Sequence, residues 1–191
     1  MQEYKRENPL FSLCGLNCGL CPRYHTEGVS KCPGCGGKDF HLKHPACAVI
    51  TCNTKHDKVE YCFQCSEYPC KKYVAVSDSD SFITYRNVLA DFTKAREYGL
   101  ESYFRDLQAK INFLEYLLAN FNDGRRKNFY CLAVNLFTIE DLHLIKSKIE
   151  TKLTTRYVDK ESQIKVILPI FEEQAKEKGV ILKLRKKEKQ E

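Results

Sequence analysis

Ten of the eleven cysteines in this chain lie in four segments: CGLNCGLC at residues 14–21, CPGCGG at 32–37, CAVITC at 47–52 and CFQCSEYPC at 62–70. These cysteines are Cys14, Cys18, Cys21, Cys32, Cys35, Cys47, Cys52, Cys62, Cys65 and Cys70. Thiolates at such short spacings are the ligands that zinc and iron–sulfur clusters require. The sequence therefore predicts a metal-binding N-terminal region with these ten cysteines as its candidate ligands.

Three of the cysteine pairs have two residues between their members, a spacing that lets a tight turn bring both sulfurs to one ion. Around Cys32 and Cys35, glycines can take positive φ and turn backbone N–H groups toward the sulfurs. Ten thiolates fill two four-cysteine sites with two left over, or three sites if two histidines join them. We expect two or three zinc ions, and the spacing leaves open which cysteines share one.

The histidines of the same region are open as additional ligands. They are His25, His41, His44 and His56. For any single one of them, a surface position without a metal is the simpler interpretation. Cys131 lies alone in an apolar helical pattern, so we expect it to pack in a core rather than bind metal.

An iron–sulfur cluster is the alternative cofactor. Cys14, Cys18 and Cys21 have the spacing of the cluster motif of radical S-adenosylmethionine enzymes. Leu20, however, stands where those enzymes usually have an aromatic residue, and the chain is too short for their partial barrel. No strand–helix unit surrounds any cysteine pair, so a thiol-redox function of the thioredoxin type is not indicated.

The composition is that of a folded chain, since 43% of its 191 residues are apolar and 12% are aromatic. The first 75 residues contain few Leu, Ile and Val, so this part needs metal to stabilise its fold. We find no secretory signal and no apolar run long enough to cross a membrane. We therefore expect a cytoplasmic protein without membrane contact, where reducing conditions favour metal over disulfides.

The expected fold is mainly α, with a small irregular cysteine-rich metal-binding domain followed by an all-α helical domain. We place the first domain at residues 1–76, with residues 1–13 as a lead-in, and the second at residues 77–191. Apolar periodicity predicts five helices in the second domain. They cover residues 82–98, 101–121 and 125–136, a stretch opened by Thr138, and a stretch starting near Asp159.

Local signals refine these helices. Thr138 and Asp141 resemble a capping box, and Pro169 predicts a kink or a split in the last helix. In the first helix, Leu89 and Phe92 are expected on the buried face. We also expect short strands at residues 10–13 and 180–184, and a basic tail at residues 185–191.

The cysteine pattern also resembles a known family. The resemblance lies in Cys14-Gly-Leu-x-Cys18-x-x-Cys21-Pro, Cys32-x-Gly-Cys35, the pair Cys47 and Cys52, and Glu60-Tyr-Cys62-x-x-Cys65-x-x-Tyr-Pro-Cys70. These residues are similar to those of domain-of-unknown-function family 3795, a bacterial and archaeal family regarded as zinc-binding. The resemblance covers residues 12–73 and implies zinc ligands without an established activity. The helical half resembles an extension of longer members.

Three classes of function follow from these patterns. Zinc closed by four protein ligands folds a domain and leaves no open position for catalysis, which favours a binding or scaffolding protein. Nucleic-acid binding is the alternative, because Arg125, Arg126 and Lys127 form a basic cluster at a predicted helix start. The net charge of +6 is modest for such a protein. An enzyme is not indicated, since no phosphate loop, serine triad order or metalloprotease motif occurs.

Overall fold

The computed structural model describes residues 4–56, 58–74, 79–153 and 159–186. Within these ranges the chain forms eight α-helices and two 3-10 turns and no β-strand. The N-terminal part is irregular and the part that follows is helical, which confirms the predicted fold class. None of the described helices is long and apolar enough to cross a membrane.

The chain divides into two compact units. Unit 1 comprises Met1–Arg105 together with Leu184–Glu191, and unit 2 comprises Asp106–Lys183. The domain boundary expected at residues 76 and 77 falls among residues 75–78, outside the described residues, and stays a prediction. All ten candidate ligands lie in unit 1.

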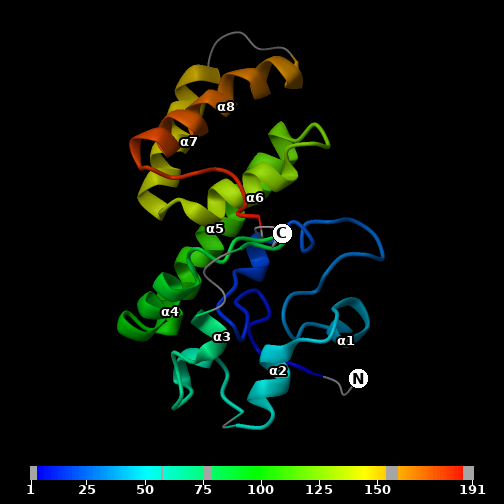
Figure 1. Cartoon of the computed structure of the whole chain (residues 1–191). Helices are drawn as coiled ribbons and strands as arrows, with labels where there is room; N and C mark the ends of the chain where they lie inside the picture. Colours follow the sequence, from blue (N-terminus) through cyan, green and yellow to red (C-terminus); the bar gives the residue numbers. More distant parts are fainter. Residues whose placement is uncertain (1–3, 57, 75–78, 154–158, 187–191) are drawn as a thin grey trace, which may run out of the picture. The chain divides into compact units, whose positions relative to one another are not determined.

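Short helices and turns make up the cysteine-rich part of unit 1 (Figure 1). Its elements are the 3-10 turns Cys18–Leu20 and Cys62–Gln64 and the helices α1 (Phe40–Lys43), α2 (Ala48–Asn53) and α3 (Lys71–Val74). Proline and glycine interrupt the chain between them, so no longer helix forms there. Contacts between distant parts of the chain therefore position these loops.

An aromatic core holds these loops together. Phe11, fully buried, packs on Tyr61 and Tyr103 with ring centroids 5.1 and 4.5 Å apart. Phe92 joins the core from α4 (Val88–Glu97), with its ring 5.7 Å from that of Phe11. Such aromatic contacts bury large apolar areas, which compensates for the small number of aliphatic residues in this part of the chain.

The short strand expected at residues 10–13 is wrong. The backbone there bonds to nearby loops: Gly19 N–H donates to Leu10 O at 3.0 Å, and Ser12 N–H donates to Leu16 O at 2.9 Å. Cys62 N–H then donates to Leu13 O at 2.9 Å. These bonds fold the segment into turns and leave no continuous edge for strand pairing.

The first long helix begins later than predicted. Helix α4 starts at Val88 rather than at residue 82, because Asp80 accepts the N–H of Tyr85 at 2.9 Å and holds the preceding residues in a loop. Leu89, expected on the buried face, is 51% exposed, whereas Phe92 is buried as expected. Helix α5 (Leu100–Phe121) agrees with the predicted range 101–121.

Unit 2 is built from the rest of α5 and from α6 (Lys127–Leu136), α7 (Ile139–Leu153) and α8 (Lys160–Glu177). Helices α7 and α8 pack against each other (Figure 1). The capping box is confirmed, since Asp141 N–H donates to Thr138 Oγ1 at 3.2 Å and Thr138 N–H donates to Asp141 Oδ2 at 3.3 Å. Pro169 lies inside α8, which remains one continuous helix rather than splitting.

The strand expected at residues 180–184 is also wrong, since the described residues there are irregular. Val180 N–H donates to Ala175 O at 2.8 Å and so ends α8. The chain then returns to unit 1, where Asp80 N–H donates to Arg185 O at 2.9 Å. The guanidinium of Arg185 donates to Asp80 Oδ1 at 2.8 Å. This ion pair and the backbone bond hold the segment, rather than the repeated hydrogen bonds of a β-strand.

Candidate metal centre

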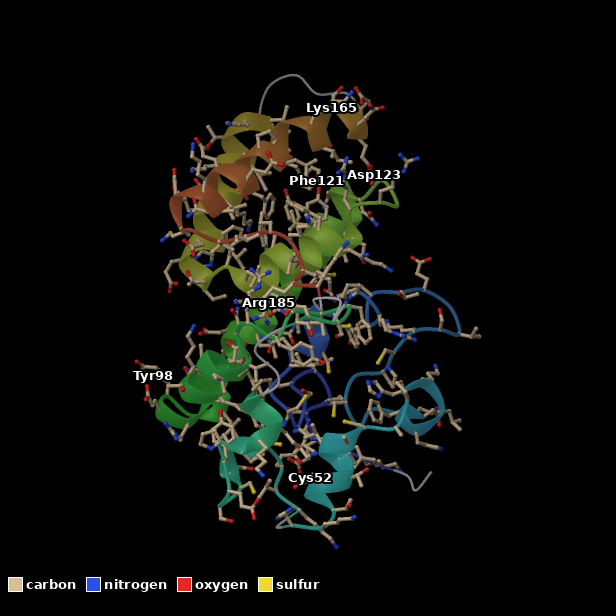
Figure 2. All side chains as sticks on the ribbon, in the orientation of Figure 1. Cys52, Tyr98, Phe121, Asp123, Lys165 and Arg185 are labelled. Carbon is tan, nitrogen blue, oxygen red and sulfur yellow. The ribbon has the colours of Figure 1, made fainter. Side chains whose placement is uncertain are left out.

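The ten candidate ligands line two separate cavities in unit 1. All eleven cysteines are described and none forms a disulfide. Figure 2 draws their sulfur atoms in yellow and labels Cys52 at the lower part of the view. Every predicted cysteine ligand is found on the wall of one cavity or the other.

The larger cavity has a volume of about 490 Å³. Six cysteines line it: Cys14, Cys18, Cys21, Cys32, Cys35 and Cys47. The apolar side chains of Phe40, Ile50 and Phe82 form other parts of its wall. We call it the large cavity, and its size is that of a small-molecule pocket rather than of a single ion.

The smaller cavity has a volume of about 30 Å³. The remaining four cysteines line it: Cys52, Cys62, Cys65 and Cys70. We call it the small cavity. Val49 of α2 and Lys72 and Tyr73 of α3 line both cavities, so the two cavities share part of their walls.

The sulfurs line the cavities without forming a coordination sphere. Among the described residues, no group of three or more His, Cys, Asp or Glu side chains has the arrangement of a metal site. The sulfurs nevertheless influence one another. The pKa of Cys62 is raised to about 11, first by burial and then by the charges of Cys70, Cys52 and Cys65.

The same electrostatics act on the wall of the large cavity. Burial raises the pKa of Cys18 well above its ordinary value, and the charges of Cys35 and Cys14 add to the increase. Burial also raises the pKa of Cys14 and raises that of Cys35 to about 11. Buried thiols are therefore neutral unless a cation enters, and a divalent cation reverses the balance because it binds thiolates.

The hydrogen bonds around the sulfurs fit a metal centre. Ser12 Oγ lies 3.2 Å from Cys14 Sγ, and backbone groups of Leu16 and Leu13 lower the pKa values of Cys14 and Cys35 by hydrogen bonding. Such donors orient thiolates and offset their charge in metal sites. By the chemistry of this donor set, the residues present fit a soft divalent ion or a metal–sulfur cluster.

The turn around Cys35 is shaped by glycine as predicted. Gly34 has φ +84° and Gly36 has φ +76°, conformations that other residues rarely adopt. A Cβ on Gly34 would lie 2.4 Å from the carbonyl oxygen of Pro9, which accepts the N–H of Cys35 at 2.8 Å. The turn therefore needs glycine both for its φ and for the close approach of Pro9.

The histidines are divided among different surroundings. His44 lines the large cavity and His56 lines the small one. Nδ1 of His56 lies 3.8 Å from a carboxylate oxygen of Glu67. Nε2 of His25 lies 2.7 Å from the carbonyl oxygen of Gly19, and His41 lies in α1.

Arg6 is a site residue that sequence reasoning missed. Its side chain is 1% exposed, donates to Phe11 O and Glu60 O at 2.7 Å each, and pairs with the Glu60 carboxylate at 2.8 Å. The guanidinium also lowers the pKa of Cys35, partly offsetting the effect of burial. Residues 1–13 carry no spacing signal, so no sequence pattern indicated that Arg6 lies beside Cys35.

The basic cluster proposed for nucleic acid has acidic neighbours. Arg126 Nε lies 3.4 Å from the Asp123 carboxylate, and Arg125 N–H donates to the same side chain at 2.8 Å. In the tail, Arg185 pairs with Asp80 and residues 187–191 lie outside the described residues. The nucleic-acid alternative stays a prediction. Cys131 is 2% exposed in α6, in agreement with the predicted core position.

Comparison with known proteins concerns the cysteine-rich region alone. No curated protein and no solved structure matches this chain. A family model matches residues 10–75, about a third of the chain, and agrees with the resemblance carried by the cysteine spacing. The helices from α4 onward lie outside the match. Residues 10–75 therefore carry the pattern of the family described as protein of unknown function (DUF3795).

Proposed function

We propose that the cysteine-rich region is a structural zinc module and that the protein uses it for binding or scaffolding. One observation carries the proposal: all ten clustered cysteines line cavities within one compact unit. Cys14 and Cys35 are buried beside hydrogen-bond donors, and thiolates are soft ligands that suit zinc. The helical remainder then serves as the attached domain.

Zinc also explains how so irregular a segment keeps its shape. Cysteine-rich loops with a small apolar core gain their folding free energy from the metal itself. In this protein the module would hold two or three ions, and each closed site would lack an open coordination position. We therefore expect a module without catalytic activity of its own.

The test is elemental analysis of the purified full chain with its visible absorption spectrum. Two or three zinc ions per chain and no colour support the proposal. Removal of zinc by a chelator should then abolish protection from hydrogen exchange in residues 14–70, because the loops depend on the metal, while α7 and α8 keep theirs. A colourless chain without bound metal, fully protected in the loops, contradicts it.

An iron–sulfur cluster is the second candidate because of the size of the large cavity. About 490 Å³ is far more than one ion occupies, and Cys14, Cys18 and Cys21 all line it. A cluster held there would supply electron-transfer chemistry and a brown colour. Iron and sulfide in equal amounts, with broad absorption near ~400 nm, would favour this candidate over zinc.

A further inference from the structure

We infer that Cys52, Cys62, Cys65 and Cys70 form one tetrahedral zinc site of their own, independent of the metal held by the other six cysteines. This inference rests on the proposed metal-binding function and assigns its ligands. Sequence spacing does not say which cysteines share an ion, since any four of the ten thiolates supply the four ligands that one zinc needs. In the tertiary structure the ten cysteines fall into two groups.

The first argument is the division of the cysteines between two cavities. The four sulfurs named above line the small cavity, and the other six line the large cavity, with no cysteine common to both walls. Val49, Lys72 and Tyr73 line both cavities.

The second argument is size. A site for one water molecule needs about 10–15 Å³, and the small cavity measures about 30 Å³. One zinc ion fits this space, whereas an iron–sulfur cube does not. Zinc requires sulfurs about 2.3 Å away, so side-chain rotation must draw the four sulfurs inward from their positions on the wall.

The third argument is how the backbone presents the four sulfurs. Cys62 opens a 3-10 turn and Cys65 ends it, with Cys65 N–H donating to Cys62 O at 3.1 Å. Cys70 directly precedes α3, and Tyr73 N–H donates to its carbonyl at 2.8 Å. Cys52 completes the set from α2. Three short elements thus place the four thiols on the wall of one small cavity.

The fourth argument is an unsatisfied hydroxyl beside the site. Tyr73 is 6% exposed, and its buried hydroxyl has no hydrogen-bond partner among the described residues. Tyr73 lines the small cavity together with Cys62. A buried hydroxyl of this kind is an outer partner that a zinc thiolate can use to offset its charge.

The test uses the full wild-type chain loaded with zinc. A chelator removes zinc stepwise, exposed thiols are alkylated, and the labelled cysteines are mapped by mass spectrometry. We expect Cys52, Cys62, Cys65 and Cys70 to become labelled together, in one phase that releases one zinc ion per chain. Labelling of any of the four in the same phase as the other six, or of the four in different phases, overturns the inference.

Variants give a second measurement. Cys65→Ser should lose one zinc ion per chain by native mass spectrometry, and Cys35→Ser should lose a different ion, so that the double variant loses both. Cys131→Ser is the matched control, since Cys131 lies in α6, lines neither cavity and should leave the zinc count unchanged. A wild-type chain that binds no zinc defeats the proposed function as well, whereas zinc shared between the groups defeats this inference alone.

Discussion

Asn17 offers a sharp test of how the first cysteine loop is held. It lies between Cys14 and Cys18 and is 3% exposed. Its amide nitrogen donates to Asp91 Oδ2 at 2.9 Å, and its amide oxygen accepts the hydroxyl of Tyr103 at 2.8 Å. The side chain thereby joins the loop to α4 and α5 within unit 1.

We predict that Asn17→Ala destabilises unit 1 by about 3 kcal/mol. A hydrogen bond to a charged group contributes about 1.5–3 kcal/mol and a neutral one about 1 kcal/mol, and the buried Asp91 carboxylate loses a donor. Such a loss is a large part of the stability of a domain. The melting temperature of unit 1 should fall by roughly 10 °C or more.

The assay is urea unfolding of the purified chain, followed by circular dichroism and by hydrogen exchange of the peptides of unit 1. Tyr103→Phe removes only one of the two hydrogen bonds and should cost about 1 kcal/mol. Tyr98→Phe is the matched control, because Tyr98 is 73% exposed at the end of α4 (Figure 2) and its loss should change stability by less than about 0.5 kcal/mol.

A double-mutant cycle between Asn17→Ala and Tyr103→Phe completes the test. The two effects should be non-additive by about 1 kcal/mol, since one hydrogen bond is lost in both variants. Strict additivity, or a cost for Asn17→Ala no greater than that of Tyr98→Phe, would refute the role given to the buried amide.

Three further predictions concern other parts of the fold. Burial tends to raise the pKa of Asp80, but hydrogen bonds from Arg185 and the Tyr85 N–H lower it from 3.8 to about 2. The ionised Asp80 therefore stabilises the folded state fully above about pH 4, and this contribution is lost as the pH falls toward 2. The difference in unfolding free energy between wild type and Asp80→Asn should therefore be at most about 2 kcal/mol near pH 4 and should shrink as the pH falls to 2. A difference that does not change with pH would contradict this role of Asp80. Gly34→Ala should cost clearly more than the ~1 kcal/mol expected for Gly28→Ala, because both have positive φ but only Gly34 meets backbone within 4 Å; equal unfolding free energies would show that the contact relaxes. Asp141→Ala should destabilise unit 2 by about 2–3 kcal/mol without changing the zinc count, because it removes the carboxylate that accepts the Thr138 N–H at 3.3 Å in the capping box of α7 and the Gln174 side-chain amide at 3.0 Å. Hydrogen exchange of α7 and native mass spectrometry measure both effects, and zinc loss would contradict the separation of the two roles.

The long helices were predictable because their signals are local. Thr138 and Asp141 meet across one turn, and Asp159 accepts the N–H of Ser162 at 2.8 Å at the start of α8. Apolar residues at helical spacing bury one face whatever lies opposite. For these reasons the predicted ranges of α5 to α8 agree with the structure.

The start of α4 was not predictable in this way. The apolar pattern continues back to residue 82, but Asp80 binds both Arg185 and the N–H of Tyr85, which favours a loop over a helix. Arg185 lies 105 residues farther along the chain. A periodicity argument contains no information on so distant a partner, and tertiary contacts override local propensity.

The candidate ligands themselves came from the sequence, because the chemistry of ten clustered thiols does not depend on the fold. The proposed grouping of these cysteines did not come from the sequence, because spacing restricts the distance only between near neighbours such as Cys62 and Cys65. Arg6 reaches Glu60 across 54 residues, and it was missed for the same reason.

The amino-acid sequence by itself determined the mainly α class, the ranges of α5 to α8 and the glycine-dependent turn at Cys35, and it supplied the candidate cysteine ligands. The reason is that each of these depends on interactions within a few residues of the chain. Only the tertiary structure decided that six of the cysteines line one cavity and four line another, and that Asn17 bonds to residues 74 and 86 positions away. Loops without regular hydrogen bonding take their positions from such distant contacts, because no local interaction is strong enough to place them.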